Sequence, residues 1–444
     1  MSVSLTSGAA SAPRTMAWLR RGEALAAGAI LIAFCSTNLL TWLYGSPDDL
    51  PLGAGNPYRR FFLFSYAIIL ALAVVNWRPV WAVARRLWLL GAFHGLLFAS
   101  LLWSVQPGAT LRGAVALFMT SLAAITLYAR FGLDGSARLC LTVLVGLAAA
   151  SLGLLAVAPD LAVHQDQHAG LLRGVFGHKN VAGNVLALAV PALLLLAARR
   201  RRLSPWHGLA AVTIIVVVLM TGSKTSLLVV VAGLALAPAS PLAHGDARPL
   251  AAAALMTGLT AALLVALIVT APEALTTLVG KDATFTGRTF IWDALAHLIG
   301  RRPLLGYGYS AIWDLPYGPL YRFVEEWGIN AGHNAFLDFT VDMGATGLAL
   351  LTGLFLSAMV AGLRACRYGP TPEGLFITAT VLVLALLSLA ETVLPTAHRL
   401  HWVALVLALI AAHEPRHQRQ PRPGRDADPL TGPEIDRQNP RHAP

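Results

Sequence analysis

Four polar segments of the sequence combine cations, hydroxyl groups and glycines, and long apolar runs separate most of them. Their chemistry-bearing residues are Arg173, His178 and Lys179 in the first segment, Lys224 in the second, Arg288 in the third and His333 in the fourth. Lysine and arginine neutralise phosphate groups, and arginine also binds them through paired hydrogen bonds. Histidine titrates closest to neutral pH, so His333 is the obvious general base. These residue types predict an anionic substrate and a proton-transfer step.

We expect the side chains of these segments to divide into two groups. The predicted catalytic residues are His333, Arg288 and Lys224, and the predicted substrate-binding residues are Lys179, Arg173, His178, Tyr307 and Arg399. Tyr307 belongs to the glycine-containing aromatic turn 304–309, which suits contact with a sugar. Structural roles are the alternative, because a lysine at a helix end can snorkel toward water and a lone histidine at a helix start commonly supports folding.

Among the arginines of the third segment, Arg288 is the best functional candidate. Apolar residues recur after it at helical spacing and predict an amphipathic helix at the membrane interface: Ile291, Trp292, Leu295, Leu298 and Ile299. Arg288 falls in the first turn, where a cation opposes the helix dipole unless an anion binds. Arg301 and Arg302 fall near the other end, where cations are favourable in any case.

The fourth segment predicts a helix that begins after His333 and runs into a long apolar span. Gly344, reached after ten intervening residues, allows this helix to bend or to approach a neighbour closely. In the first segment, Asn180 is expected to cap the following helix, whose terminal amides attract anions. Glu391, near the end of a later span, is interpreted as one member of a local interfacial pair with His398 or Arg399.

The composition predicts a polytopic α-helical membrane protein. Of the 444 residues, 56% are hydrophobic and only 12% are charged, whereas soluble chains carry about twice that charge. Apolar runs of roughly 17–25 residues recur, each long enough to cross a bilayer as a helix. The first span has no convincing cleavage site after it, which argues against a cleaved signal peptide. The net charge of +11 fits positive-inside anchoring rather than binding of nucleic acid.

Twelve spans are predicted, at 25–44, 61–77, 87–103, 111–128, 139–158, 181–198, 206–221, 226–239, 250–271, 344–363, 374–393 and 400–413. An inside N-terminus leaves arginine in every inner loop, including the run Arg199–Arg202. The predicted order is a cytoplasmic N-terminus (1–24), spans one to nine (25–271), a large outer loop that carries the site (272–343), spans ten to twelve (344–413) and a disordered cytoplasmic tail (414–444). All four polar segments then lie on the outer side.

No metal and no cofactor are predicted. The acidic residues of the outer loop form no tight Asp-x-Asp pair, and the three cysteines have no metal-ligand spacing. The segment Thr221-Gly-Ser-Lys224-Thr-Ser looks like half of a phosphate loop, but it lacks the upstream glycine and the preceding soluble strand. A nucleoside-triphosphate site is therefore rejected.

Together the four segments resemble the O-antigen ligase and O-antigen polymerase superfamily of bacterial membrane glycosyltransferases. His333 and Gly344 fit its His-x10-Gly signature, and Lys224-Thr-Ser-Leu-Leu228 fits its Arg-x3-Leu element with Lys in place of Arg. Arg288 occupies the place of the loop arginine that members use on the lipid diphosphate. The resemblance spans roughly Arg173 to Val360. The Lys at 224 and the surrounding segments look more like the exopolysaccharide-polymerase branch.

The resemblance implies an all-α, GT-C-type fold of about twelve transmembrane helices with one large periplasmic loop. It implies an undecaprenyl-diphosphate-linked glycan as donor and either a glycan or lipid A core as acceptor. His333 would take the proton of the attacking sugar hydroxyl, and Arg288 and Lys224 would stabilise the leaving diphosphate. The reaction would invert the anomeric centre without a metal. The expected place is the bacterial inner membrane, among membrane lipids, with the site facing the periplasm.

Two other functions stay open at this point. An O-antigen ligase that attaches O-antigen to lipid A core uses the same chemistry on a different acceptor. A transporter of lipid-linked glycan is the main non-enzymatic alternative, and it would show internal repeats and ionisable groups at mid-membrane depth. The sequence shows no clear repeat, and His94 is the only ionisable residue deep within a predicted span.

Overall fold

The structure, a computed structural model, describes residues 12–35, 57–166, 168–200, 204–236, 288–313, 315, 318–327, 331–369 and 371–414. These residues are mostly helical and contain no β-strand, apart from an isolated bridge between Val163 and Leu172. The predicted all-α class is confirmed for this part of the chain. The predicted span 250–271 and the predicted tail after Glu414 lie outside the described residues.

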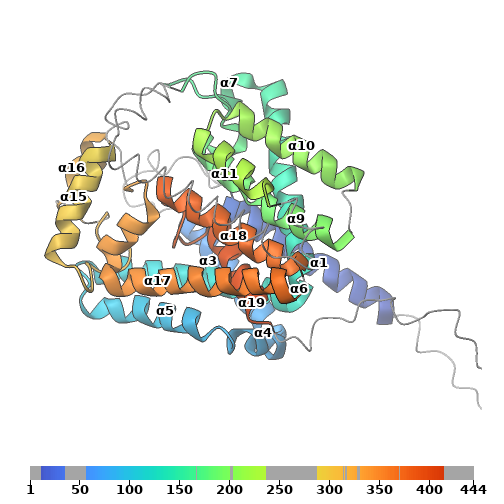
Figure 1. The fold of residues 1–444 in the computed structure, drawn as a ribbon, viewed down its shortest axis with the longest axis horizontal. Helices are drawn as coiled ribbons and strands as arrows, with labels where there is room; N and C mark the ends of the chain where they lie inside the picture. The colour runs from blue at the N-terminus through green and yellow to red at the C-terminus, as the bar shows by residue number, and fades with distance from the viewer. Residues whose placement is uncertain are drawn as a thin grey trace, which may run out of the picture. The chain divides into compact units, whose positions relative to one another are not determined.

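The helices follow one another along the described chain (Figure 1). The first are α1 (Ala12–Cys35), α3 (Pro57–Val75), α4 (Trp77–Ala84), α5 (Trp88–Ala99), the 3-10 helix η2 (Ser100–Leu102), α6 (Pro107–Val157) and α7 (Pro159–Ala162). Next come η3 (Gly174–Phe176), α8 (Lys179–Ala187), α9 (Ala189–Arg200), α10 (Pro205–Met220) and α11 (Lys224–Leu234). The last are α15 (Arg288–Arg301), α16 (Tyr321–Trp327), α17 (Ala335–Tyr368), α18 (Thr371–Ala390) and α19 (Leu400–Ala412).

Several of these helices have the length and composition of membrane spans. In the described chain, four helical stretches qualify, namely α6, residues 179–199 of α8 and α9, α17 and α18. The pair α3 and α4, bent by 94°, makes a fifth if it counts as one span. The helices α10, α11 and α19, and α5 together with η2, are apolar but shorter. The chain is therefore a multi-pass membrane protein, and the number of twelve spans stays a prediction.

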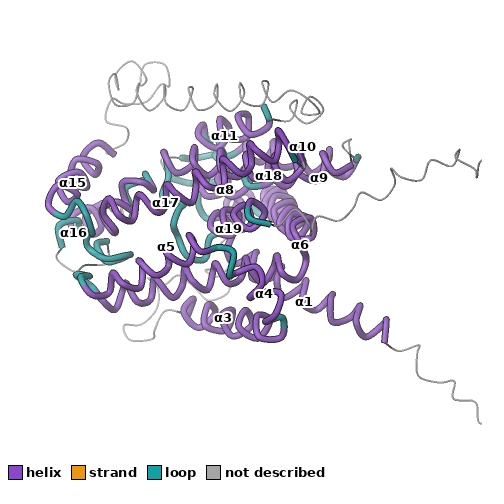
Figure 2. The backbone as a smooth tube through the Cα atoms, turned by 60° about the horizontal axis from the view of Figure 1, so that its bottom comes forward, coloured by secondary structure: helices purple, strands orange, loops and turns teal. Residues whose placement is uncertain are grey.

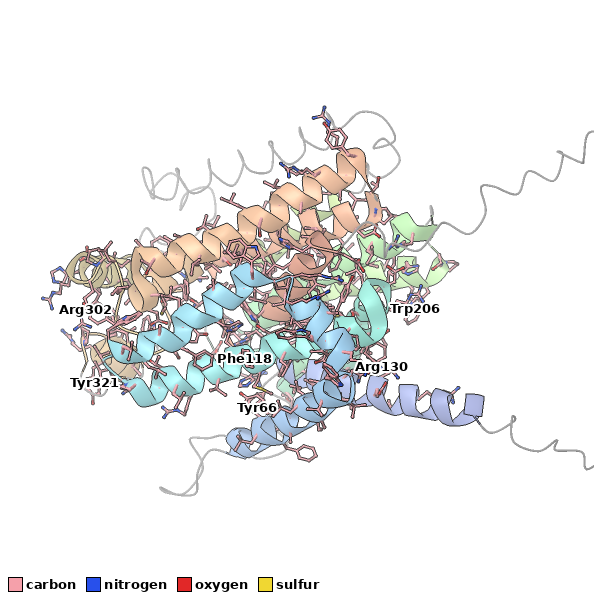
Figure 3. All side chains as sticks on the ribbon, turned by 90° about the horizontal axis from the view of Figure 1, so that it is seen from below. Tyr66, Phe118, Arg130, Trp206, Arg302 and Tyr321 are labelled. Carbon is pink, nitrogen blue, oxygen red and sulfur yellow. The ribbon has the colours of Figure 1, made fainter. Side chains whose placement is uncertain are left out.

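The inner loop expected between the spans 111–128 and 139–158 is replaced by a kink. The helix α6 continues through this region and is interrupted only at Gly132, which has φ 66° and ψ −178°. Glycine adopts a positive φ without steric cost, so the chain turns at this residue. Figure 3 shows Arg130 and Trp206 toward one end of the helices and Arg302 and Tyr321 at the other. Their placement on opposite sides of a membrane stays a prediction.

The buried centre of the helical unit consists of α9, α18 and α19. Nearly every residue of α18 from Glu373 to Leu387 is buried, and so is most of α19. A helix that is apolar on all sides is stable only where neighbours cover it, and α18 packs against α9, α11, α17 and α19 (Figure 2). By contrast, α17 exposes large apolar side chains such as Leu356, as a lipid-facing helix would.

The amphipathic helix predicted after Arg288 is confirmed as α15. Its residues Ile291, Leu295 and Leu298 are buried in a small apolar cluster that also contains Tyr307 and Val341. Since α15 packs against α17, its apolar face is covered by protein. The position of the helix at the membrane interface stays a prediction. The helix presents its first residue, Arg288, to the end of α18.

Candidate active site

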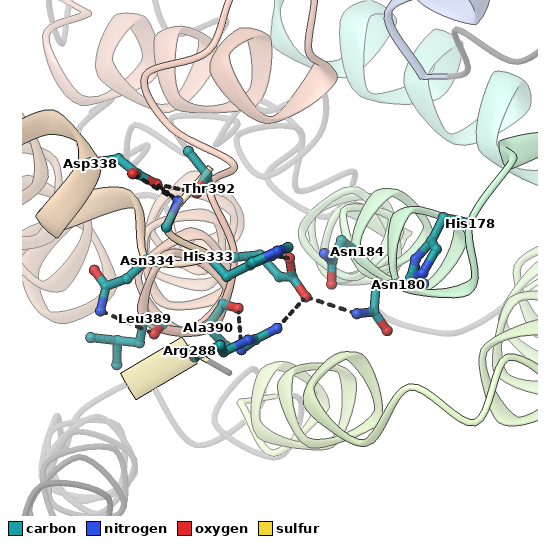
Figure 4. Close-up of polar contacts among 12 residues, drawn as sticks. His178, Asn180, Asn184, Arg288, His333, Asn334, Asp338, Leu389, Ala390 and Thr392 are labelled. Atoms are coloured by element: carbon teal, nitrogen blue, oxygen red, sulfur yellow. Dashed lines mark hydrogen bonds and ion pairs between the residues drawn. The ribbon is translucent and has the colours of Figure 1, made fainter. Parts of the chain in front are cut away.

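Glu391 is the point at which the predicted segments meet. It is the first residue after α18, and its carboxylate accepts hydrogen bonds from Asn180 Nδ2 at 2.9 Å, from Arg288 Nη2 at 3.5 Å and from His333 Nδ1 at 3.1 Å (Figure 4). The side chain of Glu391 is 14% exposed, compared with 22% for Arg288 and 39% for His333. A nearly buried carboxylate thus joins two of the predicted catalytic residues and leaves the histidine accessible.

The end of α18 holds Arg288 as well. The last carbonyls of a helix have no partner within the helix and carry partial negative charge. The carbonyl of Ala390 accepts a bond from Arg288 Nη1 at 3.0 Å, and the carbonyl of Leu389 accepts one from Asn334 Nδ2 at 3.3 Å. Arg288 opposes the dipole of its own helix, as predicted. The negative groups that offset this are Glu391 and the carbonyl end of α18, both supplied by the protein itself.

His333 is held in a left-handed conformation at the start of α17. Its φ is 53°, and the next residue, Asn334, caps the helix by accepting bonds from the amides of Phe336 and Leu337, each at 3.1 Å. Because a carboxylate can only accept, Nδ1 of His333 carries the proton in the bond to Glu391. Within the described residues Nε2 of His333 has no hydrogen-bond partner, so it is free to accept a proton.

The surroundings of Glu391 keep it ionised. Burial alone would raise its pKa, but the hydrogen bond from His333 and the positive charge of Arg288 outweigh burial and lower the pKa below its ordinary value of 4.5. Glu391 lies beyond the end of α18, outside that helix. At neutral pH its single negative charge is therefore shared between the imidazole and the guanidinium group.

The predicted bend at Gly344 is confirmed, and it fixes α17 against the turn that follows α15. Gly344 has φ 64° and ψ −166°, and a Cβ there would lie 2.2 Å from the backbone carbon of Leu304. The amides freed by the bend are satisfied, since Ala345 donates to the carbonyl of Pro303 at 2.8 Å and Thr346 to that of Leu304 at 3.2 Å. Glycine is required here by both conformation and space.

The start of α8 differs from the prediction. His178, not Asn180, is the N-cap, and its Nδ1 accepts the amide of Asn180 at 3.2 Å. The side chain of Asn180 is thereby free to bond Glu391. One turn later, Asn184 accepts a bond from Ser226 Oγ at 2.8 Å, which holds the first turn of α11 against α8. Lys224, the exposed first residue of α11, is thus anchored next to the helix that carries Asn180.

A cluster of three imidazoles adjoins the site through His178. The ring centroids of His164, His168 and His178 lie 5.0 to 5.6 Å apart. Burial and then the two neighbouring histidines lower the pKa of His178 below its ordinary value of 6.5. Lys179 is buried, and its amide donates to His164 Nε2 at 3.1 Å. His178 and Lys179 therefore lie beside the Glu391 cluster rather than in it.

The remaining predicted residues have other surroundings. Arg173 donates from Nε to the carbonyl of Leu161 at 3.1 Å, next to α7. Tyr307 is buried in the small apolar cluster, where its hydroxyl donates to the carbonyl of Leu298 at 3.2 Å and its ring lies under Arg302. No contact of these two residues with Glu391 is found in the described chain. Tyr307 therefore packs in the interior, which leaves little of it for a sugar.

Arg399 is a different case, because it immediately precedes α19 and is its N-cap. Among the described residues its side chain makes no hydrogen bond and no ion pair, and burial lowers its pKa. The predicted local pairing of Glu391 with His398 or Arg399 is wrong. The imidazole of His398 stacks on Phe62 at 3.7 Å between centroids instead. Arg399 keeps an unneutralised charge that an anionic ligand could satisfy.

Sequence reasoning singled out His333 and Arg288 as candidates but did not predict that both, together with Asn180, contact Glu391. An acidic residue at the end of an apolar helix whose other charged residue, Glu373, lies in its first turn was the available signal, since such a residue is costly unless it has a partner. No group of three or more histidine, cysteine, aspartate or glutamate side chains in the described chain could hold a metal ion.

Comparison with known proteins finds similarity over the segment that carries most of these residues. Residues 174–352 match the family model described as O-antigen ligase. The chain is also 38% identical over 90 residues to the exopolysaccharide production protein ExoQ of Rhizobium meliloti (strain 1021). That match covers 19% of this chain and about a fifth (21%) of the relative.

The resemblance to the O-antigen ligase and polymerase superfamily is thereby confirmed for the segment that contains Lys224, Arg288, His333 and Gly344. Glu391 and Arg399 lie outside the matched residues. Their part in the site therefore rests on the geometry alone.

Proposed function

We propose that this protein is an inner-membrane glycosyltransferase that acts on the periplasmic face. It moves a glycan from undecaprenyl diphosphate onto a sugar hydroxyl of an acceptor, in the polymerisation of surface polysaccharide or exopolysaccharide repeat units. The observation that carries the proposal is the convergence of His333, Arg288 and Glu391, in which the free Nε2 of the histidine faces away from its carboxylate partner. The O-antigen ligase match and the similarity to ExoQ support the polysaccharide substrate class.

His333 is the general base in this proposal. Its Nε2 takes the proton of the acceptor hydroxyl while that oxygen attacks the anomeric carbon of the donor, and the bond from this carbon to the diphosphate breaks. Glu391 holds the imidazole through Nδ1 and stabilises the imidazolium that forms. General-base assistance of this kind contributes about 10²–10⁴-fold to the rate.

The cations stabilise the leaving group. Negative charge grows on the diphosphate as the bond breaks, and Arg288 is preorganised beside His333 by the end of α18. Lys224 on α11 and the guanidinium of Arg399 are the other cations that we assign to the donor, with Lys179 and Arg173 nearby. A preorganised group that faces the developing charge stabilises the transition state by about 3 kcal/mol. Because the diphosphate already leaves readily, the scheme needs no general acid and no metal.

A single displacement inverts the anomeric centre. In such a displacement the acceptor oxygen approaches opposite to the departing diphosphate. The bond between His333 and Glu391 turns Nε2 away from the carboxylate, which leaves space for an acceptor hydroxyl.

The position of Lys224 favours polymerisation over transfer to lipid A core. Lysine neutralises a phosphate without the paired hydrogen bonds of arginine, and this feature resembles the exopolysaccharide branch, as does the ExoQ match. The family description as O-antigen ligase supports the second candidate, a ligase that attaches O-antigen to lipid A core. A transporter is the third candidate.

Gel analysis of surface glycans separates these candidates. A deletion strain is complemented with wild type, His333→Ala or the control Asp293→Asn, an exposed residue of α15, at equal membrane expression. Loss of long chains with single repeats still reaching their acceptor supports a polymerase. Loss of all acceptor-linked glycan while lipid-linked chains accumulate supports a ligase. Unchanged glycans with His333→Ala would overturn the proposal.

A further inference from the structure

The backbone around His333 is held by side chains from two helices. The residue before it, Gly332, donates its amide to both carboxylate oxygens of Asp338, at 2.9 Å and 3.0 Å. The carbonyl of Gly332 accepts a bond from Trp292 Nε1 of α15 at 2.7 Å. Both backbone polar groups of Gly332 are therefore bound by side chains, and the left-handed φ of His333 follows directly after a fixed residue.

The space at Gly332 is narrow. A Cβ there would lie 2.5 Å from Leu295 Cδ1 and 2.8 Å from Asp338 Oδ1, so a larger residue would require these two side chains to move. The leucine belongs to the buried face of α15. A positive φ at a residue other than glycine persists only where the surroundings over-determine it, and these contacts supply that constraint for His333.

The same carboxylate also reaches the residue next to Glu391. The hydroxyl of Thr392 donates a short hydrogen bond to Asp338 Oδ2, and Asp338 is only 7% exposed. Asp338 therefore bonds the residue that precedes His333 and the residue that follows Glu391 (Figure 4). It joins the loop after α18 to the start of α17 at the point where the histidine and its carboxylate partner meet.

We propose that Asp338 is a positioning residue that sets the hydrogen bond between His333 and Glu391, through Gly332 on one side and Thr392 on the other. Asp338 touches neither donor nor acceptor. Its effect reaches the reaction only through the orientation of the imidazole. The inference rests on the proposed role of His333 as base, and it adds that Asp338 and Thr392 determine how well this base works.

The test compares Thr392→Val, which keeps the shape of the side chain but removes the hydroxyl, with Thr392→Ser, which keeps the hydroxyl. Asp338→Asn is the second variant, and Asp293→Asn is the control that leaves activity unchanged. Purified proteins in liposomes are given a polyprenyl-diphosphate-linked oligosaccharide, and kcat and KM for the donor are measured. Amounts of folded protein are matched first by size-exclusion chromatography.

Thr392→Val and Asp338→Asn are expected to lower kcat by about 10- to 100-fold, because small displacements of a catalytic group are costly, while KM changes by less than about twofold. Thr392→Ser should restore most of kcat.

Wild-type kcat in both variants, or an equal loss of kcat in Thr392→Ser and Thr392→Val, would overturn the inference. Failure of the proposed base would be seen separately, as full activity of His333→Ala in the same liposomes.

Discussion

His333 and Glu391 are 58 positions apart in the chain, yet their side chains meet through a 3.1 Å hydrogen bond between Nδ1 and Oε2. The histidine comes from the start of α17 and the glutamate from the end of α18, two helices that pack along each other. The pair gives the histidine a defined tautomer and a free Nε2. Its carboxylate also binds Arg288, so a change at Glu391 affects both the base and the nearest cation.

Replacement of Glu391 by Gln is expected to lower turnover by about 10²-fold, because the imidazole loses the charge that orients it and stabilises its protonated form. Transfer of labelled glycan by purified protein measures the effect. Asp160→Asn, at an exposed aspartate of α7, is the matched control and should behave as wild type. Turnover within about twofold of wild type in Glu391→Gln would exclude the glutamate from the mechanism.

Arg288→Lys and Arg288→Gln test the cation. The guanidinium bonds Ala390 and Glu391 at once, and lysine has no planar fork to do both. We expect Arg288→Gln to lower kcat/KM by about 10²-fold, and Arg288→Lys to recover only part of it. The control is Arg322→Gln, at an exposed residue of α16. Equal activity of the lysine variant and wild type would show that charge alone is needed.

Gly344→Ala is expected to destabilise the protein. An alanine there would have a positive φ, and its Cβ would lie 2.2 Å from the backbone of Leu304. The free energy of unfolding should therefore fall by more than the 1–3 kcal/mol or so that an unfavourable backbone conformation costs. Gly353→Ala in the same helix is the control, because its Cβ would meet only a side-chain atom at 3.7 Å. Thermal unfolding in detergent should show a lower midpoint for the first variant alone. Equal midpoints would contradict the required bend.

The depressed pKa of His178 predicts a loss of stability at mildly acidic pH. As pH falls below the ordinary value of 6.5, the unfolded chain takes up a proton that the folded chain still refuses. Stability therefore falls with pH until the lowered folded pKa is passed.

His178→Asn keeps a capping side chain but cannot titrate, so its midpoint of thermal unfolding should depend less on pH between about 7 and 5. His297→Asn, at an exposed residue of α15, should keep the wild-type slope. An identical slope for His178→Asn and wild type would remove His178 from this effect.

The features that the sequence could predict depend on local pattern. The buried face of α15 followed from the spacing of Ile291, Leu295 and Leu298, and the bend of α17 followed from a glycine at a fixed distance after His333. Arg288 stood out because a cation in a first turn is unfavourable. In each case the signal lies within a few turns of one helix.

The features that sequence reasoning missed depend on packing between distant segments. Glu391 was assigned to neighbours in sequence, whereas its partners come from α8, α15 and the start of α17. Asn180 was expected at its own helix end because caps are local, but His178 takes that position. The expected loop after Tyr128 became a kink because Gly132 can turn within the helix. None of these outcomes is visible without the arrangement of the helices around α18.

The most direct test of the central claim is single-turnover transfer by purified His333→Ala in liposomes that contain a polyprenyl-diphosphate-linked oligosaccharide and an acceptor glycan. Donor binding is measured in parallel. Formation of the glycosidic bond should slow by about 10²–10⁴-fold, while donor affinity changes by less than about threefold. Bond formation at the wild-type rate would show that His333 is not the general base and would contradict the proposed mechanism.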